Sequence, residues 1–410
     1  MESPQKLRIT HELKPVYYDK FRCLMGDCAL SCCKDNWKIA FSKKDYLRLR
    51  HLKCSPGLEE NLSKTVRRIR HGPAAERWYA EFDMSAGVCP MLTEEGLCGL
   101  QMEQGGEVLP RVCKVFPRME ACTGAGLERS LSPGCEGVLG LLWELPEGID
   151  FVLEPLPKPL QAKRLYDTPL FLAHEEVRSL CIDFLQDRAL PLPRRILLMC
   201  MLLRDLADHP EDPERWLRKA AGVLAEPGRE ELCAGLSGGG ATGRNLRIIN
   251  NLNLLQAIRQ NDEETNRLRR RIQETLEAYW RNGQTHFCLE DYLRCEAVFR
   301  ERYGEREWFF ENLMVCIYFH MSFPVLTSPE ELWKSCVNFC NLYSICRFIS
   351  VLSCYDRGMD EAAARAELFR GLTLVSRGLL HNPEAQTHLR DELFQNGSAT
   401  LAHMAILLSG

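Results

Sequence analysis

Apolar residues recur at helical spacing through most of the chain beyond residue 160. The repeats are clearest at 268–279, 313–320 and 332–343, where apolar side chains fall three or four residues apart. Side chains at this spacing lie on one face of an α-helix. The second part of the chain is therefore predicted to be α-helical.

The first part of the chain has a different sequence pattern. Residues 1–155 show few helical repeats and are rich in cysteine, glycine and proline. This pattern indicates loops rather than long regular elements. Four short elements are predicted: helices at 42–52, after a possible Ser42 N-cap, and at 58–69, and strands at 78–82 and 128–131.

A proline-bearing segment at 155–159 separates the loop-rich part from the helical part and is typical of a stiff connection. A chain of 410 residues also exceeds the size at which one hydrophobic core usually divides. We therefore expect a mainly α protein of two domains. A loop-rich, cysteine-rich domain of residues 1–155, with little β-structure, packs on an α-helical domain of residues 156–410. The glycine run at 238–243 is interpreted as a linker, because no strand precedes it as a nucleotide-binding loop requires.

Charge and hydropathy restrict the partners. The 52 basic and 56 acidic residues give a net charge of −4, which offers no field for nucleic acid. The longest strongly apolar run, 196–203, falls short of the ~20 residues that span a membrane. The opening residues lack the apolar core of a secretory signal. We expect a cytoplasmic protein that binds neither nucleic acid nor a membrane.

Ten of the 20 cysteines lie in the first third of the chain, and eight of them form two groups. Thiols stay reduced in the cytosol, so clustered cysteines there indicate metal ligands more than disulfides, which are the main alternative. The later cysteines lie in apolar helical patterns, where a buried thiol acts as a small hydrophobe. The eight predicted ligands are Cys23, Cys28, Cys32, Cys33, Cys89, Cys98, Cys113 and Cys135.

Eight thiols exceed the needs of one four-ligand site. Thiolates hold iron–sulfur clusters, and tetrahedral sets of cysteine and histidine hold zinc, so the spacing fits either centre. The set therefore contains spare thiols or forms two sites. Closing the long loop between the two cysteine groups would also stabilise a domain with a small core.

Further motifs accompany the cysteines. Trp37 follows the first cysteine group, and proline follows Cys89. The helical part contributes two short motifs far apart in the chain. These are Glu311-Asn312 with Phe323-Pro324, and Ser376-Arg377 with His381-Asn382.

In this combination the chain resembles the flagellin lysine-N-methylase family, within the broader zinc- or iron-chelating cysteine-cluster proteins. The resemblance implies methyl transfer from S-adenosylmethionine to lysine side chains of flagellin, by a cytoplasmic protein with a 4Fe-4S cluster. It further implies cofactor contacts from Trp37, Asn312 and Arg377. The chain departs from the family pattern at Pro110-Arg111, where the order of the two residues is reversed, and in its extra Cys122.

Lysine methylation constrains the chemistry of such a site. A lysine amine attacks a methyl group only when neutral, and its pKa in water is about 10.4. The enzyme must therefore desolvate the amine or offer a base. Glu311 is the predicted catalytic base. The predicted aromatic lining consists of Trp37, Tyr79, Trp308 and Tyr318.

The sequence leaves the role of the cluster open. Three thiolates would leave one iron free to bind S-adenosylmethionine, whereas four would make the cluster a structural brace. Two other classes remain alternatives. One is a non-enzymatic zinc- or iron-binding adaptor, and the other is a redox sensor that responds through Cys32 and Cys33.

Overall fold

The computed structural model divides into two compact units. The helical unit comprises Met1–Phe21, Glu120–Gly134 and Val138–Gly410, and the cysteine unit comprises Arg22–Met119 and Cys135–Gly137. The structure describes residues 6–34, 39–71, 73–123, 126–163, 166–227, 229–233, 240–257 and 289–409.

A four-stranded sheet belongs largely to the helical unit and has the order β5-β6-β1-β7. Strand β1 pairs in parallel with β6 and antiparallel with β7. The predicted strand at 128–131 is confirmed as β6, where leucines at both ends are buried. The bounds are β1 Lys6–Pro15, β5 Arg118–Cys122, β6 Leu127–Leu131 and β7 Phe151–Lys163.

The proline-bearing segment predicted to connect two domains lies inside strand β7. Pro155 pairs with His11 of β1, so the segment is part of the sheet and the expected boundary at residue 155 falls within one unit. Proline lacks a backbone N–H and is tolerated only on edge strands. Strand β7 is such an edge, which explains how three prolines fit there.

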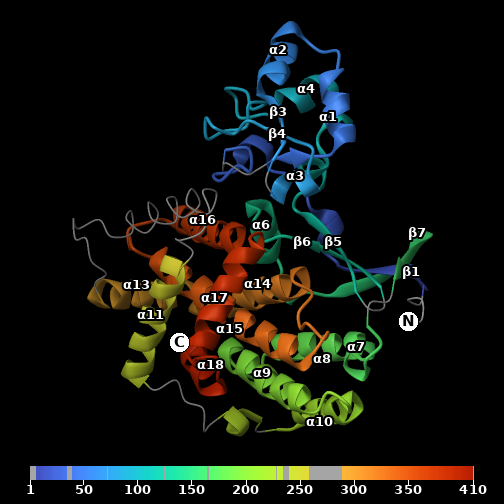
Figure 1. Ribbon diagram of the computed structural model, residues 1–410. Coiled ribbons are helices and arrows are strands. Elements are labelled where there is room, and N and C mark those ends of the chain that lie inside the picture. Colours follow the sequence, from blue (N-terminus) through green and yellow to red (C-terminus); the bar gives the residue numbers. More distant parts are fainter. Residues whose placement is uncertain are drawn as a thin grey trace. The chain divides into compact units, whose positions relative to one another are not determined.

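Helices make up most of the helical unit, which confirms the mainly α prediction (Figure 1). The predicted repeats at 313–320 and 332–343 lie in α14 and α15, whereas the repeat at 268–279 lies outside the described residues. The helices are α6 Glu136–Trp143, α7 Pro169–Leu172, α8 His174–Gln186, α9 Leu192–Asp208, α10 Pro213–Ala225, α11 Gly240–Ala257, α13 Leu289–Tyr303, α14 Glu307–His320, α15 Pro329–Leu352, α16 Glu361–Leu380, α17 Pro383–Gln395 and α18 Leu401–Leu408.

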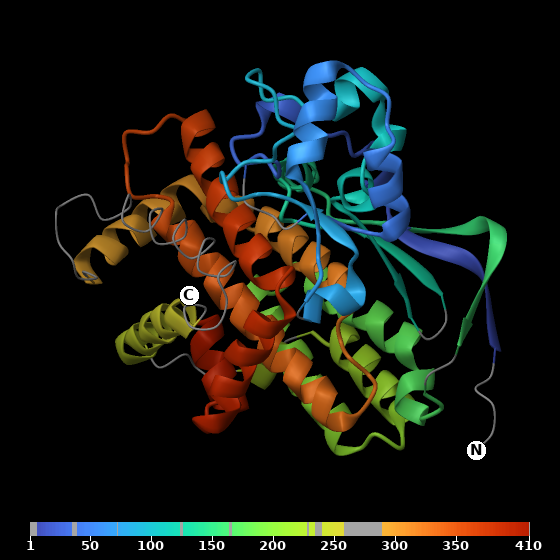
Figure 2. The ribbon, with the colours of Figure 1, turned by 45° about the horizontal axis from the view of Figure 1, so that its top comes forward.

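Helix α15 forms the centre of this unit (Figure 2). It packs against α9, α13, α16 and α18 and is buried on nearly every side, as expected for a helix that is apolar all round. Among the described helices, α15 is long and apolar enough to cross a membrane, but 89% of its most apolar window is buried inside the protein. Its burial is that of a core helix.

Side-chain caps fix where several helices begin. The Ser328 hydroxyl accepts from the Glu331 N–H at the start of α15, followed by Pro329 in the first turn. Asn382 caps α17 in the same way by accepting from Ala385. The cap places His381 at the junction between α16 and α17.

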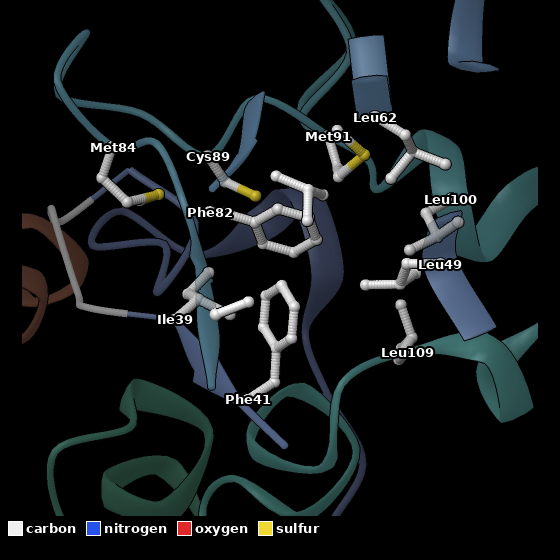
Figure 3. Close-up of a cluster of buried hydrophobic side chains, with 12 residues drawn as sticks. Ile39, Phe41, Leu49, Leu62, Phe82, Met84, Cys89, Met91, Leu100 and Leu109 are labelled. Atoms are coloured by element: carbon white, nitrogen blue, oxygen red, sulfur yellow. The ribbon is translucent and has the colours of Figure 1, made fainter. Parts of the chain in front are cut away.

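The cysteine unit has a small core of its own (Figure 3). A three-stranded sheet of order β2-β4-β3 brings the rings of Phe41 and Phe82 to 5.2 Å, and Leu49 and Leu62 of the flanking helices join them. The apolar cluster thus contributes to holding this unit together. Its elements are β2 Ala40–Phe41, β3 Val66–Arg68, β4 Ala80–Phe82, α1 Lys43–Arg50, α2 Pro56–Thr65, α3 Pro73–Arg77, α4 Gly99–Gln104 and α5 Arg111–Val115.

Local predictions in the cysteine unit succeed to different degrees. Ser42 caps α1 by accepting from the Asp45 N–H, as predicted, and the strand predicted at 78–82 contains β4. The helix predicted at 58–69 ends at Thr65. The chain continues as β3, because Val66 pairs with Phe82 and buries its β-branched side chain in the sheet.

Candidate functional site

All eight predicted cysteine ligands belong to the cysteine unit. Cys135 joins it although its chain neighbours on the N-terminal side do not. The Glu136 carboxylate draws this short segment in, because it accepts from the N–H groups of Ala29 and Leu30 at 2.9 and 2.8 Å. The fold thus joins 135–137 to the first cysteine group.

A second tie joins the first cysteine group to the downstream group. The Cys89 N–H donates to the Cys33 carbonyl at 2.7 Å. Cys89 lies in the apolar core, and Cys98 forms a β-bridge with Leu92 that closes the loop between them. The two cysteine groups are therefore neighbours in the folded unit.

The thiols influence one another's ionisation. Burial, together with Cys135, Glu136, Cys23 and Cys32, raises the pKa of Cys28 to about 12. Burial also raises the pKa of Cys89 to about 11, with further contributions from Cys98 and Cys32. Cys32 thus lies within electrostatic range of both groups. At neutral pH these thiols are protonated, so metal binding would release protons.

The donor chemistry of this unit fits a thiolate-bound centre, but the arrangement is not yet that of a closed site. Iron–sulfur clusters and structural zinc require several neighbouring thiolates, which the eight cysteines provide. Within the described ranges, however, no group of three cysteine, histidine, aspartate or glutamate side chains is placed to hold one metal ion.

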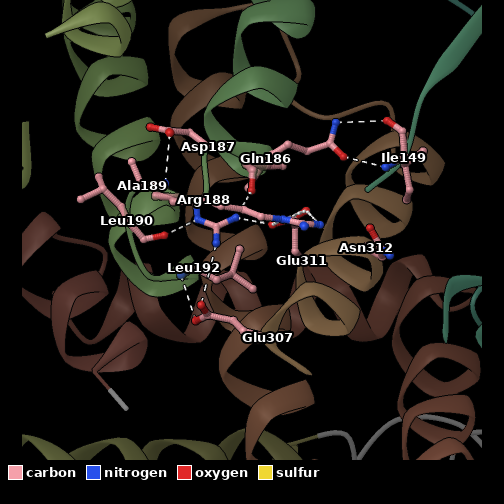
Figure 4. A network of polar contacts seen from close by, with 12 residues as sticks. Ile149, Gln186, Asp187, Arg188, Ala189, Leu190, Leu192, Glu307, Glu311 and Asn312 are labelled. Carbon is pink, nitrogen blue, oxygen red and sulfur yellow. Dashed lines mark hydrogen bonds and ion pairs between the residues drawn. The ribbon is translucent and has the colours of Figure 1, made fainter. Parts of the chain in front are cut away.

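Glu311, the predicted base, lies in a buried ion-pair network (Figure 4). Its carboxylate is fully buried and accepts from Arg188 at 2.9 Å and from Arg195 at 2.5 Å. Arg195 also donates to the carbonyls of Leu185 and Leu190. This arrangement ties α14 to the connection between α8 and α9, so it fits a structural role better than that of a proton acceptor.

Two of the three residues with an implied cofactor role, Asn312 and Arg377, form hydrogen bonds with backbone carbonyls of the helical unit. The Asn312 amide donates to the carbonyls of Leu142 and Leu145 at 3.1 and 2.7 Å, and Arg377 donates to the Gly134 carbonyl at 2.8 Å. Trp37, the third of them, lies outside the described residues. Cofactor binding by these side chains stays a prediction.

The described aromatic candidates are packing residues. Tyr318 is fully buried and donates to the Arg178 carbonyl at 2.8 Å, while Trp308 packs at 6.1 Å from Trp143. Tyr79 belongs to the cysteine unit, where the Arg68 guanidinium lies 4.5 Å from its ring. An aromatic lining built from these side chains stays a prediction.

The structure reveals a histidine–serine cluster, defined as Ser130, Ser132, His320 and His381. The Ser132 hydroxyl lies 2.7 Å from Nε2 of His381, and the Ser130 hydroxyl lies 3.4 Å from Nδ1 of His320. The two rings meet edge to face with centroids 5.6 Å apart. The sequence motifs included His381 but not its contact with His320, because three distant segments supply this cluster. Its one local signal is the alternation of the two serines on one face of the β6 strand and its extension.

Both rings of the cluster are neutral at physiological pH. Burial, together with the nearby His381, lowers the pKa of His320 to about 3. Burial and the positive charge of Arg377 lower the pKa of His381 to about 4. Neutral imidazole has one ring nitrogen that accepts hydrogen bonds. Each ring therefore carries no positive charge and one acceptor nitrogen, and both histidines are half-buried.

Comparison with known proteins gives a consistent result. Residues 178–407 match the family model described as the FliB lysine N-methylase C-terminal domain. The lysine-N-methylase of Salmonella typhimurium is 25% identical over 178 residues, which cover 42% of this chain and 41% of that protein. The flagellar biosynthetic protein FliU of Salmonella muenchen is 26% identical over 140 residues, covering 33% and 79% respectively.

The extent of these matches is limited. The match spans less than half the length of the Salmonella lysine-N-methylases, including that of Salmonella choleraesuis, which is 25% identical over 178 residues. No solved structure is significantly similar.

Proposed function

Because the chain belongs to the FliB lysine N-methylase family, we propose that it is a protein lysine N-methyltransferase. The proposed methyl donor is S-adenosylmethionine, and the proposed substrate is flagellin or another protein with accessible lysines. The observation that carries the proposal is the family match over residues 178–407, which includes both histidines of the histidine–serine cluster. The flagellar name of the FliU relative supports the choice of flagellin. Such a reaction would take place in the cytoplasm.

We further propose that the histidine–serine cluster receives the lysine amine. Direct proton transfer from an ordinary lysine, with a pKa of about 10.4, to His381, with a pKa of about 4, would cost about 9 kcal/mol. The site must therefore lower the amine pKa as well, as desolvation does. In that setting the neutral rings would accept a hydrogen bond from the neutral amine and aim its lone pair at the methyl group.

The cysteine unit is the proposed site of a 4Fe-4S cluster, with zinc as the alternative. Its ligands would come from the eight cysteines, and their raised pKa values make binding dependent on proton release. A bound cluster would supply either an open iron for the amino and carboxylate groups of S-adenosylmethionine or a brace for the unit. The gathering of thiols also suits a metal-binding adaptor, the second candidate function.

Methyl transfer tests the main proposal. The anaerobically purified chain is incubated with flagellin and methyl-labelled S-adenosylmethionine, and mass spectrometry locates labelled lysines. We expect methyl-lysine with the unchanged chain and about a hundredfold slower transfer with His381→Ala, the order of loss when a reactant is no longer held in position. His209→Ala is the matched control, because His209 is an exposed residue just after α9.

Each outcome distinguishes the candidate functions. Loss of transfer in His381→Ala with normal transfer in His209→Ala would support the cluster as the amine site. Equal rates would remove His381 from the reaction. Metal binding without methyl transfer to any lysine-bearing protein would favour the adaptor.

A further inference from the structure

The helical unit contains a cavity of about 660 Å³ lined by the ends of α9, α11, α13 and α18. Its volume lies within the range of ordinary small-molecule sites. Its lining shares no residue with the histidine–serine cluster, the eight cysteines or the Glu311 network. We call it the arginine cavity, because four of its lining residues are Arg194, Arg244, Arg247 and Arg300.

Positive charge dominates the lining of the arginine cavity. Four of the described residues that line it are arginines, and Glu296 is the one acidic residue among them. Glu296 is 3% exposed and is shared between Arg247 at 3.4 Å and Arg300 at 2.9 Å. Arg247 is itself 4% exposed. Buried cations are costly unless an anion pairs with them, so the buried Arg247, which shares the Glu296 carboxylate with Arg300, would gain from a further anion in the cavity.

Arg244 offers a buried donor to which an anion in the cavity could bind. Its Nε is buried and has no hydrogen-bond partner among the described residues. Arg244 lies between Gly240 and Arg247 on one face of α11, because the spacings are four and three residues. A guanidinium nitrogen without a partner costs free energy that a bound acceptor would recover.

The same cavity receives the beginning of α11. Gly240 and Ala241, in the first turn of this 18-residue helix, line it. Pro191, Leu197 and Leu408 form apolar parts of the wall. The cavity thus combines anion donors with a surface for an apolar group.

We propose that the arginine cavity binds a small organic anion that carries phosphate or carboxylate groups on an apolar body. Arginine recognises both groups through paired N–H donors. S-adenosylmethionine is a poor match, because its sulfonium and ammonium outweigh its single carboxylate. The cavity is therefore a second ligand site, and its existence does not depend on the proposed methyl transfer.

Calorimetric titration of the full chain at low ionic strength tests this site. The probes are ADP, pyrophosphate and citrate, with adenosine as the uncharged control. We expect at least one anionic probe to bind with a submillimolar Kd, more weakly as salt is added, and adenosine not to bind. ADP or pyrophosphate binding would identify phosphate as the ligand group, and citrate binding would identify carboxylate.

Variants assign the binding to the cavity. Arg244→Gln is expected to raise the Kd of the bound probe at least tenfold. Arg218→Gln should leave this Kd unchanged, because Arg218 lies on α10 and is 71% exposed. If circular dichroism shows that Arg244→Gln disturbs folding, Arg300→Gln replaces it, since that side chain is 63% exposed. Failure of every anion to bind at millimolar concentration, or equal affinities of the cavity variant and Arg218→Gln, would overturn the proposal.

Discussion

Replacing Glu311 by glutamine separates a structural from a catalytic role for this carboxylate. The substitution keeps the size of the side chain and one acceptor oxygen, but it removes the negative charge between Arg188 and Arg195. The two arginines differ in their surroundings. The Arg195 side chain is 3% exposed, whereas that of Arg188 is 40% exposed. The loss should therefore fall mainly on Arg195.

The expected cost follows from that difference. Removing one partner of a buried ion pair typically costs about 3–5 kcal/mol, because the other charge stays buried. Arg195 still donates to two backbone carbonyls and lies 3.8 Å from the partly exposed Glu307 carboxylate, so we expect the lower end, about 3 kcal/mol. The partly exposed Arg188 contributes little, and Arg188→Gln should cost about 1 kcal/mol or less.

Urea unfolding followed by far-ultraviolet circular dichroism measures both changes, and methyl transfer is measured on the same preparations. At temperatures where it is folded, Glu311→Gln should bind as much iron and sulfide after anaerobic reconstitution as the unchanged chain does. The double variant Glu311→Gln with Arg195→Met should recover part of the stability, since it leaves no unpaired buried charge. A Glu311→Gln protein within about 1 kcal/mol of the original would refute the structural role. If that stable protein also failed to methylate, Glu311 would be the base.

Three other predictions address the histidine–serine cluster and the cysteines. The folded pKa values of His320 and His381, about 3 and 4, lie below the ordinary 6.5. Their contribution to the free energy of unfolding is therefore complete above pH 6.5 and is lost as pH falls toward these values. Urea midpoints measured against pH should show this decline, and a flat profile would contradict it. Gly134→Ala places a Cβ 3.2 Å from the Ser132 hydroxyl and 3.3 Å from the His381 ring and should cost about 1–3 kcal/mol, whereas Gly140→Ala in α6 meets nothing within 4 Å and should be neutral or stabilising in thermal unfolding. Cys28→Ser should lower the iron and sulfide bound after anaerobic reconstitution, while Cys122→Ser should not, and equal contents in the two variants would exclude Cys28 as a ligand.

Local patterns were sufficient for elements that depend on neighbouring residues. The helical repeat at 332–343 and the Ser42 cap both follow from residues a few positions apart. The position of the 155–159 segment did not follow, because its place in β7 depends on pairing with β1, about 150 residues earlier.

The candidate sites show the same limit. The order of the cysteines indicated a common unit, and the structure places all eight in one. The histidine–serine cluster was missed as a cluster because His320 and His381 end separate helices and meet serines near residue 131. The positive charge around Glu311 could not be predicted from neighbouring residues either, since its arginine partners lie more than 100 residues away.

The insertion of the cysteine unit between β1 and β6 affects the order in which a ribosome delivers the parts of the sheet. Strand β1 ends at Pro15, and its parallel partner β6 begins at Leu127, more than a hundred residues later. At about 5–20 residues per second, β1 waits roughly 5–20 s for that partner. All of Arg22–Met119 emerges during the wait. Most of the cysteine unit can therefore fold during translation, before the sheet of the helical unit can close.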